Sequence, residues 1–394
     1  MSHGPFVIVE VEPGVDPRAS FERAWESGAR AVPVSKSLPA AARARIAARL
    51  DAVRCARATG VVLPTSGSSG EPRLIDLSLE AMEASARAGA EVIPFGAGDV
   101  WHASLAPSHV GGVMILMRAR FLGGAVRFGP QPRSWSDLDG CTHVSLVAAQ
   151  LARLLEDRAP VPSSLKAAML GGGPSAQALR DAAIARGVPL YATYGLTETC
   201  SQVATGALEH GDPATLAGAA LPGASIAIDA ASGEILVDGP TLARGEFIGG
   251  DAGGALVPLA RPLATRDAGF IDAQGRLHVV GRLDAMFISG GKNIHPETIE
   301  RALCQLPFVR AACVVGVPDA KWGMRPVAFV DIVSPPPRAF AELLGETLEP
   351  YLVPDAIYAM SMDEAARMKP RRAALAARIA SGERFNMLEP GGVL

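Results

Sequence analysis

The sequence lacks paired cysteines. Its five cysteines lie far apart and form no CxxC pair: Cys55, Cys141, Cys200, Cys304 and Cys313. This spacing gives no support for a zinc site or a disulfide framework, and it favours a reducing compartment such as the cytoplasm.

The sequence also lacks long apolar runs. Met1 to Val11 contain no charged segment followed by a long apolar core, and no stretch reaches about 18 uninterrupted apolar residues. We therefore expect a cytoplasmic protein with neither a secretion signal nor a membrane span.

An excess of one charge is missing as well. The formal net charge is -3, from 37 basic and 40 acidic residues that are interspersed along the chain. No basic face for nucleic acid and no acidic run follow from this pattern. We expect a small-molecule partner held by local groups, and no nucleic acid; a homo-oligomer stays open.

Hydrophobic residues, in contrast, are plentiful. They make up 49% of the 394 residues, enough for large cores and two or three domains. Short apolar runs alternate with segments of helical spacing, which predicts α/β layers with mostly parallel sheets. The expected strands are 6–11, 61–63, 74–77, 101–105, 125–128, 143–147, 167–170 and 190–193, and the expected helices are 40–58, 79–90, 114–121, 149–157 and 176–186.

The pattern changes twice toward the C-terminus. From about Gly223, short strands separated by Gly and Asp turns predict a small β-rich subdomain, with a hairpin around 273–275. After Asp284 the sequence predicts a helix opened by Pro296, strands near 312–317 and 327–332, and helices from Ala339 and Arg371. We expect a large α/β domain over 1–283 and a separate α+β domain over 284–394.

A glycine and hydroxyl cluster lies between two of the expected strands. It consists of Thr65, Ser66, Gly67, Ser68, Ser69 and Gly70, followed by Glu71, Pro72 and Arg73. Glycines let backbone N–H groups converge and hydroxyls add donors, which together form a cradle for phosphate oxygens. A polar surface loop is the alternative interpretation, and the Walker A pattern is not matched.

Other stretches fall at the ends of expected strands. Tyr194, Gly195, Thr197 and Glu198 combine an aromatic face, a glycine turn, a hydroxyl and a carboxylate that could attend Mg²⁺. Gly171, Gly172 and Gly173 would admit a planar ring close to the backbone. His109 could orient a reacting group or satisfy its bonds within a loop. Asp267 could accept from two ribose hydroxyls or serve as a turn residue.

These motifs, in this order, resemble the adenylate-forming superfamily of acyl-CoA synthetases, adenylation domains and luciferases. The resemblance is carried by TSGSSGEPR at 65, YGLTE at 194, TRD at 265 and the long run GRLDAMFISGGKNIHPETIE from Gly281 to Glu300. It covers the chain from Val61 onward and implies a mobile C-terminal domain.

The resemblance also implies roles and cofactors. The hydroxyl loop would shield the ATP phosphates, Tyr194 would border adenine, and Glu198 would attend Mg²⁺. Asp267 and Arg282 would hold the ribose, Asp284 would be the hinge, and Lys369 would serve adenylation. After the hinge turns, the segment Gly290, Gly291 and Lys292 would lie beside the channel for the CoA thiol.

The chain departs from the superfamily pattern in three places. Arg73 replaces the usual lysine, which keeps the charge and changes the geometry. Met368 replaces the glycine before Lys369. About a hundred residues that typical members carry before the phosphate loop are absent, so we expect a trimmed N-terminal subdomain.

Within the superfamily, two further stretches resemble the o-succinylbenzoate:CoA ligases of menaquinone biosynthesis. These are 105–112, LAPSHVGG, and 142–155, from Thr142 to Leu155. The resemblance implies an acyl pocket with small walls and polar contacts: Val147, Ala148, Gln150, Gly171, Ser201 and Gln202. Two alternatives stay open, namely another acyl-CoA or carrier-loading enzyme and a non-catalytic nucleotide-binding module.

Overall fold

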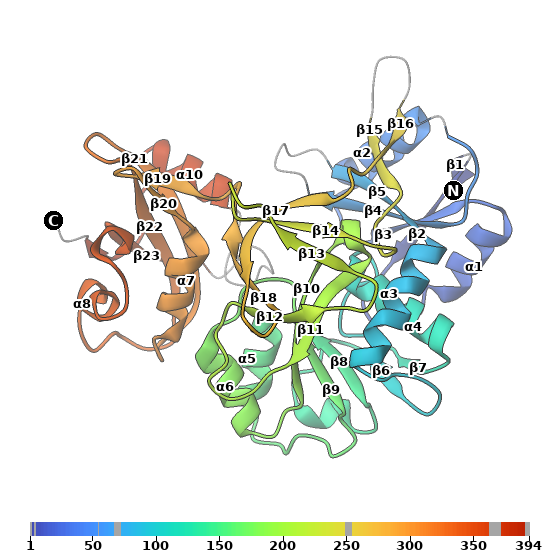
Figure 1. Cartoon of the computed structure of the whole chain (residues 1–394), viewed down its shortest axis with the longest axis horizontal. Coiled ribbons are helices and arrows are strands. Elements are labelled where there is room, and N and C mark those ends of the chain that lie inside the picture. The colour runs from blue at the N-terminus through green and yellow to red at the C-terminus, as the bar shows by residue number, and fades with distance from the viewer. Residues whose placement is uncertain are drawn as a thin grey trace.

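The computed structural model describes residues 2–3, 5–53, 55–66, 72–248, 254–361 and 372–390. Two large sheets form the body of the molecule, and a third sheet lies in a lobe at the C-terminal end (Figure 1). Within the described residues, no helix is both long and apolar enough to cross a membrane.

The first sheet holds the N-terminal strands. In spatial order it runs β1 (Ser2–His3), β2 (Phe6–Val11), β3 (Arg30–Ser35), β4 (Gly60–Ser66), β5 (Pro72–Ser78), β15 (Gly245–Ile248) and β16 (Ala255–Pro258). Strands β4 and β5 are antiparallel from Gly60↔Ser78 to Ser66↔Pro72. The expected loop therefore connects two paired strands, although residues 67–71 lie outside the described residues.

The second sheet has eleven strands and passes through the centre of the molecule. Its order is β13 (Ser225–Ile228), β14 (Glu234–Asp238), β17 (Leu263–Ile271), β18 (Arg276–Arg282), β12 (Leu216–Ala220), β11 (Ser201–Ala207), β10 (Leu190–Leu196), β9 (Ala167–Leu170), β8 (His143–Leu146), β6 (Val100–His102) and β7 (Ala125–Arg127). The β-rich segment expected after Gly223 is present, with the β17–β18 hairpin, and it is hydrogen bonded to this sheet.

The prediction of mostly parallel pairing is confirmed for the strands expected up to Thr193, and it does not extend to the strands after them. Parallel pairing joins β2 to β3 and β3 to β4 in the first sheet, and β7, β6, β8, β9 and β10 in the second. The other pairs in these two sheets are antiparallel. The physical reason is connection length, because parallel strands need a long crossover, whereas β4–β5 and β10–β11 are joined by only a few residues.

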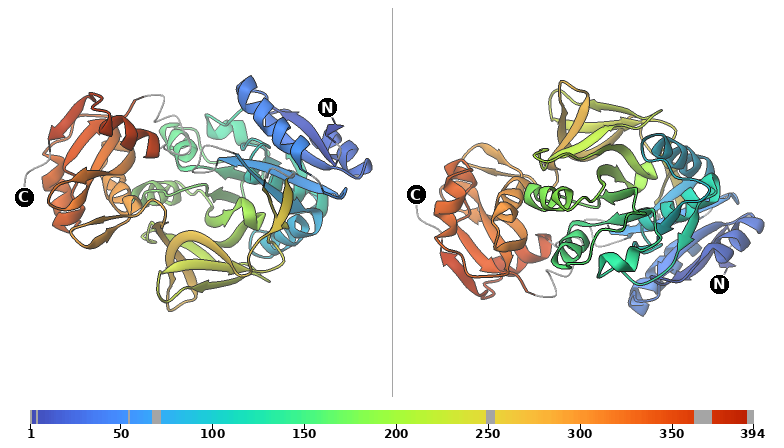
Figure 2. Two further views of the ribbon diagram at one scale, coloured as in Figure 1. Left: turned by 90° about the horizontal axis from the view of Figure 1, so that it is seen from above. Right: turned by 90° about the horizontal axis from the view of Figure 1, so that it is seen from below.

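Helices cover both faces of these sheets (Figures 1 and 2). They are α1 (Arg18–Glu26), α2 (Ala40–Ala52), α3 (Leu79–Val92), α4 (Val110–Leu122), α5 (Ala148–Glu156) and α6 (Gln177–Ala185), with short 3₁₀ turns η1 (Trp135–Leu138) and η2 (Thr197–Thr199). Ser78 caps α3 as predicted, since its Oγ accepts from the N–H of Ala81 at 3.0 Å.

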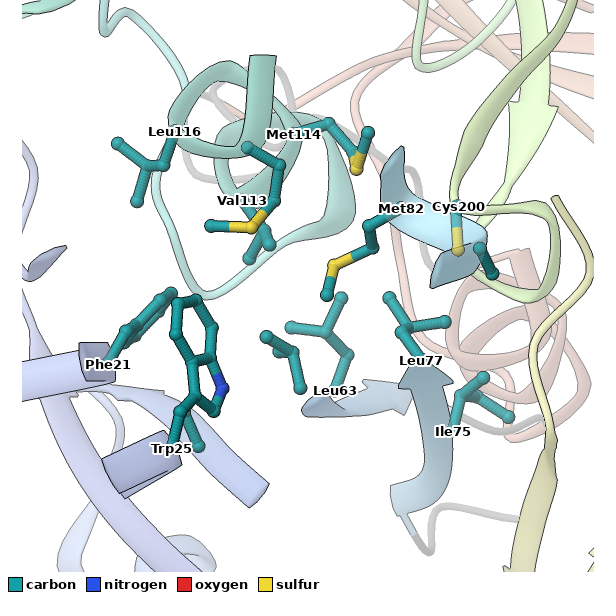
Figure 3. Close-up of a cluster of buried hydrophobic side chains, with 14 of the residues drawn as sticks. Phe21, Trp25, Leu63, Ile75, Leu77, Met82, Val113, Met114, Leu116 and Cys200 are labelled. Carbon is teal, nitrogen blue, oxygen red and sulfur yellow. The ribbon is translucent and has the colours of Figure 1, made fainter. Parts of the chain in front are cut away.

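One apolar core lies between the first sheet and helices α1, α3 and α4. Figure 3 shows Phe21 and Trp25 facing strand residues such as Leu63, with Met82 of α3 and Met114 of α4 above them. Helix α4 is buried along most of its length, which explains its continuous apolar sequence.

The C-terminal lobe is built on the third sheet. Its order is β20 (Lys292–Ile294), β19 (Phe287–Ser289), β22 (Gly323–Ile332), β23 (Ala356–Ala359) and β24 (Met387–Pro390), and β21 (Val309–Asp319) also pairs with β22. The same lobe contains helices α7 (Pro296–Gln305), α8 (Phe340–Gly345) and α10 (Arg372–Ala380), and the 3₁₀ turn η3 (Pro350–Leu352). Both of its buried apolar clusters contain only residues after Asp284. The boundary at Asp284 itself stays a prediction.

Candidate active site

The parallel strands β8, β9 and β10 end at one edge of the central sheet. This edge gathers Val147, the glycines 171–173 and the segment after Thr193, as ligand sites in open α/β sheets require. A Cβ on Gly171 would lie 2.4 Å from the hydroxyl of Thr193, and one on Gly172 would lie 3.2 Å from a Val147 methyl. The edge is therefore tightly packed, and Gly173 has open space beside it.

The segment after Tyr194 differs from the expected glycine turn. Strand β10 continues through Gly195 to Leu196 with a bulge between Tyr194 and Gly195, and η2 follows at Thr197. Gly195 is required by a close approach, because a Cβ there would lie 1.4 Å from the carbonyl oxygen of Ser201. The prediction of a turn at Gly195 was wrong because tertiary pairing with β11 extends the strand.

A polar cluster lies beside Tyr194. Its hydroxyl donates to Asp267 at 2.7 Å, and the guanidinium of Arg282 donates to the other oxygen of Asp267 at 3.1 Å. Asp267 is buried within β17, so the turn-residue alternative is wrong. Burial raises the pKa of this carboxyl above its ordinary value, and the bonds from Tyr194 and Arg282 offset part of that rise.

Arg282 also contacts the predicted hinge. Its Nε and Nη2 donate to the two oxygens of Asp284 at 3.0 and 2.7 Å. The bond with Asp284 is the largest cause of a raised pKa for Arg282, and the charge of Asp267 adds to it. The structure thus brings Tyr194, Asp267, Arg282 and Asp284 into one charged cluster between β17 and the start of the lobe.

A second cluster surrounds Arg73. Its Nη1 donates to Glu198 at 2.8 Å, and its Nε and Nη2 lie 2.8 and 2.7 Å from one oxygen of Glu246. The bond with Glu246 is the largest cause of the raised pKa of Arg73. Glu198, the predicted magnesium ligand, is therefore paired with a cation here.

Two residues at this site were missed by sequence reasoning. Arg118 lies in α4, is 3% exposed, and donates to the side-chain oxygen of Gln202 at 2.5 Å. Burial lowers its pKa to about 10, so it remains a cation at neutral pH. A single charge in the apolar run 113–119 was a usable signal. Glu246 gave none, because it lies 173 residues from Arg73.

The other predicted acyl-pocket residues, and His109, lie at the beginnings of helices or next to a strained turn. Gln150 is buried at the N-terminus of α5, where its oxygen accepts from the N–H of Val147 at 3.0 Å, and Ala148 begins that helix. Ser201 has a φ of 81°, which is uncommon for serine and follows a left-handed Cys200. His109 precedes α4, with its N–H bonded to the carbonyl of Ala106 at 3.0 Å.

The predicted CoA segment lies on the lobe. Gly290 and Gly291 both have left-handed φ, and a Cβ on Gly290 would meet the ring of Trp322 at 2.9 Å. The ammonium of Lys292 lies 4.2 Å from the centre of the Tyr351 ring. The structure therefore separates this segment from the Arg73 cluster by placing it in another sheet. Ser66 and Thr65 end β4, whereas 67–70 and Lys369 lie outside the described residues.

The layered α/β fold, the charged clusters around Tyr194 and Arg73, and the C-terminal lobe are typical of one class of enzyme, which binds a nucleotide. A model of the AMP-binding enzyme family matches residues 55–245, and a model of the AMP-binding enzyme C-terminal domain matches 298–367. These two models together span more than half of the chain. The protein belongs to the AMP-binding enzyme family.

Two proteins of known name are similar to this chain over about two thirds of its length or more. The chain is 39% identical over 273 residues to a 2-succinylbenzoate--CoA ligase of Salmonella typhimurium, covering 68% of this chain and 57% of that protein. It is 35% identical over 317 residues to the enzyme of the same name from Bacillus cytotoxicus, covering 75% and 65%. These matches span less than two thirds of either relative.

The fold extends further than those alignments. A variant of E. coli MenE with bound OSB-AMS superposes with a TM-score of 0.81 at 28% identity, covering 95% of this chain and 88% of that chain. Wild-type E. coli MenE with a bound phenylether-linked analogue of OSB-AMS gives a TM-score of 0.74, also at 28% identity.

Proposed function

We propose that this chain activates o-succinylbenzoate with ATP and transfers the acyl group to coenzyme A. The two relatives at 39% and 35% identity carry the name of that ligase, and the E. coli protein binds OSB-AMS. In the first step, a carboxylate oxygen bonds to the α-phosphorus of ATP and pyrophosphate leaves. In the second step, the CoA sulfur bonds to the acyl carbon and AMP leaves.

The nucleotide would be held at the Tyr194 cluster. The carboxylate of Asp267, oriented by Tyr194 and Arg282, can accept from ribose hydroxyls, and the Tyr194 ring offers a face to adenine. Thr197, Gly172 and Gly173 lie on the same edge. The phosphates would then extend toward the hydroxyl loop and Arg73.

Mg²⁺ fits this site as an ion that accompanies ATP. Among the described residues, no group of three or more His, Cys, Asp or Glu side chains gathers to hold a metal. Phosphate oxygens would supply most of the ligands of an ion that arrives with ATP. The Glu198 carboxylate is the hard oxygen donor that this chain would add. The bound ion would neutralise charge on the phosphates.

Arg118 carries the choice of substrate. o-Succinylbenzoate has a second carboxylate, which needs a buried cation or several donors if it is taken out of water. Arg118 is such a cation, and within the described part of the chain its guanidinium donates to the neutral side chain of Gln202. A carboxylate beside this pair would receive a charge-assisted bond.

The test is an ATP–pyrophosphate exchange assay with o-succinylbenzoate, benzoate and a fatty acid, followed by thioester formation with CoA. We expect kcat/KM to favour o-succinylbenzoate by about 100-fold or more, because analogues leave the buried donors unpaired. Comparable efficiency with benzoate would refute the substrate. Exchange with none of the acids would favour a non-catalytic nucleotide-binding module.

A paired variant tests Arg118 directly. Arg118→Gln should raise KM for o-succinylbenzoate by about 100-fold while KM for ATP changes little. Arg120→Gln is the matched control, since Arg120 lies half a turn further along α4 and pairs with Glu22 near the surface. Equal effects of the two substitutions would contradict a role for Arg118 in binding the acid.

A further inference from the structure

Glu246 is an acidic residue at the phosphate end of the site that the superfamily resemblance does not assign. It lies on β15, whose register pairs Glu246 with Ile75 of β5. Side chains alternate along a strand, so Glu246 shares a face with Ile75 and Arg73 and is the diagonal neighbour of Arg73. Figure 1 shows β15 beside β5 at this edge of the first sheet.

The guanidinium of Arg73 divides its donors between two carboxylates. Nε and Nη2 converge on one oxygen of Glu246 at 2.8 and 2.7 Å, and Nη1 reaches Glu198 at 2.8 Å. The two glutamates are 19% and 14% exposed, whereas Arg73 is 41% exposed. The paired donors fix the plane of the guanidinium, and Nη1 points to the carboxylate proposed to attend Mg²⁺.

The arrangement explains why arginine suits this position. A lysine ammonium is a point charge on a flexible stem and cannot present a planar fork to one carboxylate while donating in another direction. If the Mg²⁺ that accompanies ATP binds the Glu198 carboxylate, Nη1 of Arg73 would lose its partner while Nε and Nη2 would keep theirs. The freed N–H is then available to a phosphate oxygen without movement of the side chain.

We propose, on the basis of the function proposed above, that Glu246 is a positioning residue for ATP. It holds the Arg73 guanidinium so that Nη1 exchanges Glu198 for a phosphate oxygen when MgATP binds. Glu246 acts through Arg73 and does not itself touch the nucleotide.

The direction in which KM for ATP changes in Glu246→Gln distinguishes a positioning role from a simple effect of charge. Glu246→Gln removes a negative charge near the phosphates, so electrostatics alone would tighten MgATP binding. Positioning predicts the opposite, namely a rise of about 5- to 20-fold in KM for ATP, with a smaller change in kcat. Glu246→Asp keeps the charge with a shorter stem and should lie between wild type and Glu246→Gln.

A second background isolates the dependence on Arg73. In Arg73→Lys, which cannot use the fork, Glu246→Gln should change KM for ATP by less than about twofold. Glu83→Gln is the control, because Glu83 forms an exposed ion pair with Arg87 on α3 away from the site. A lower or unchanged KM in Glu246→Gln, or the same change in both backgrounds, would overturn the proposal.

Calorimetric binding of MgATP keeps this test independent of the acid. Binding requires no turnover, so the Kd of wild type and Glu246→Gln can be compared even if exchange occurs with no carboxylate. A protein that binds MgATP with the predicted Glu246 dependence but activates no acid would refute the proposed function alone. Loss of the Glu246 dependence in an active enzyme would refute the positioning role alone.

Discussion

The hydroxyl of Tyr194 stabilises the charged form of Asp267, so its removal should change how nucleotide binding depends on pH. Burial is the largest cause of the raised pKa of Asp267, and the Tyr194 bond acts against it. Tyr194→Phe keeps the ring but should raise that pKa further. The proposed ribose contact needs the ionised carboxylate, so MgATP affinity should begin to fall at a higher pH in the variant as the solution is acidified.

Calorimetric titrations of MgATP across the acid range would measure this shift. Wild type and Tyr194→Phe should have similar affinity well above the pKa of Asp267 and diverge as the carboxyl is protonated. Parallel curves at every pH would show that Asp267 does not contact the nucleotide in its ionised form.

Gly195 is the glycine of this site with the least room for a side chain. Gly195→Ala would bring a Cβ within 1.4 Å of the Ser201 carbonyl, so β10 and β11 would have to separate. We expect a loss of more than about 3 kcal/mol in the free energy of unfolding. Urea denaturation measures it, with Gly345→Ala as control because a Cβ there meets nothing within 4 Å. Equal midpoints for the two variants would contradict the packing argument.

The sequence alone predicted only some of the residues of the candidate site. The motif at 194–198 predicted Tyr194 and Glu198 as candidate site residues, because an aromatic residue, a glycine and a carboxylate in that order follow an expected strand. It did not reveal that Gly195 continues the strand, since the cause is the neighbouring β11. Arg118 and Glu246 acquire meaning only through partners distant in sequence, Gln202 and Arg73.

At the scale of elements, a buried ion pair fixes the first sheet. Arg30 of β3 donates to Asp76 of β5 at 2.9 Å, and both side chains are nearly inaccessible to water. The Arg30 guanidinium also lies 5.8 and 5.4 Å from the ring centres of Phe6 and Phe247. These contacts join β2, β3, β5 and β15 around the Arg30 guanidinium.

Neutralising one partner should destabilise the whole sheet. Asp76→Asn leaves Arg30 buried without a counter-charge, which costs about 3–5 kcal/mol in the free energy of unfolding. Glu83→Gln, which breaks the exposed pair with Arg87, should cost about 0.5 kcal/mol or less. Chemical denaturation of both variants provides the comparison. A small effect of Asp76→Asn would mean that Arg30 finds other acceptors.

The positions of several strands and helices could be predicted from the local pattern of apolar and polar residues. The expected 6–11 and 167–170 coincide with β2 and β9, and the helix opened by Pro296 is α7. Helix α2 ends at Ala52 rather than 58, and β6 ends at His102 rather than 105. Strand order and direction could not be read, because hydrogen bonding between β5 and β15 joins segments far apart in the chain.

At the scale of the whole molecule, the lobe contacts the body through α7. Arg301 donates to the carbonyl of Val280 at 2.8 Å, and the carboxylate of Glu297 lies against Gly281. These contacts join the first helix of the lobe to β18, next to the predicted hinge at Asp284. The superfamily resemblance predicts that this lobe, which has its own core, rotates about the short segment at Asp284.

Rotation of the lobe leads to a testable prediction for Lys369, which lies outside the described residues. By resemblance, its charge would lie between the substrate carboxylate and the α-phosphate during adenylation only. Lys369→Ala should therefore slow ATP–pyrophosphate exchange by about 100- to 1000-fold, as loss of a transition-state donor does. Thioester formation from supplied acyl adenylate should change by less than about threefold, because that step uses the other orientation of the lobe.

Lys36→Ala is the control for this experiment, since Lys36 pairs with Glu12 on the surface of the body. It should leave both half-reactions unchanged. The ratio of the two half-reaction rates is the decisive quantity, because misfolding of the lobe would lower both together. An equal loss in both steps for Lys369→Ala would assign Lys369 a structural role and would leave adenylation without its predicted cation.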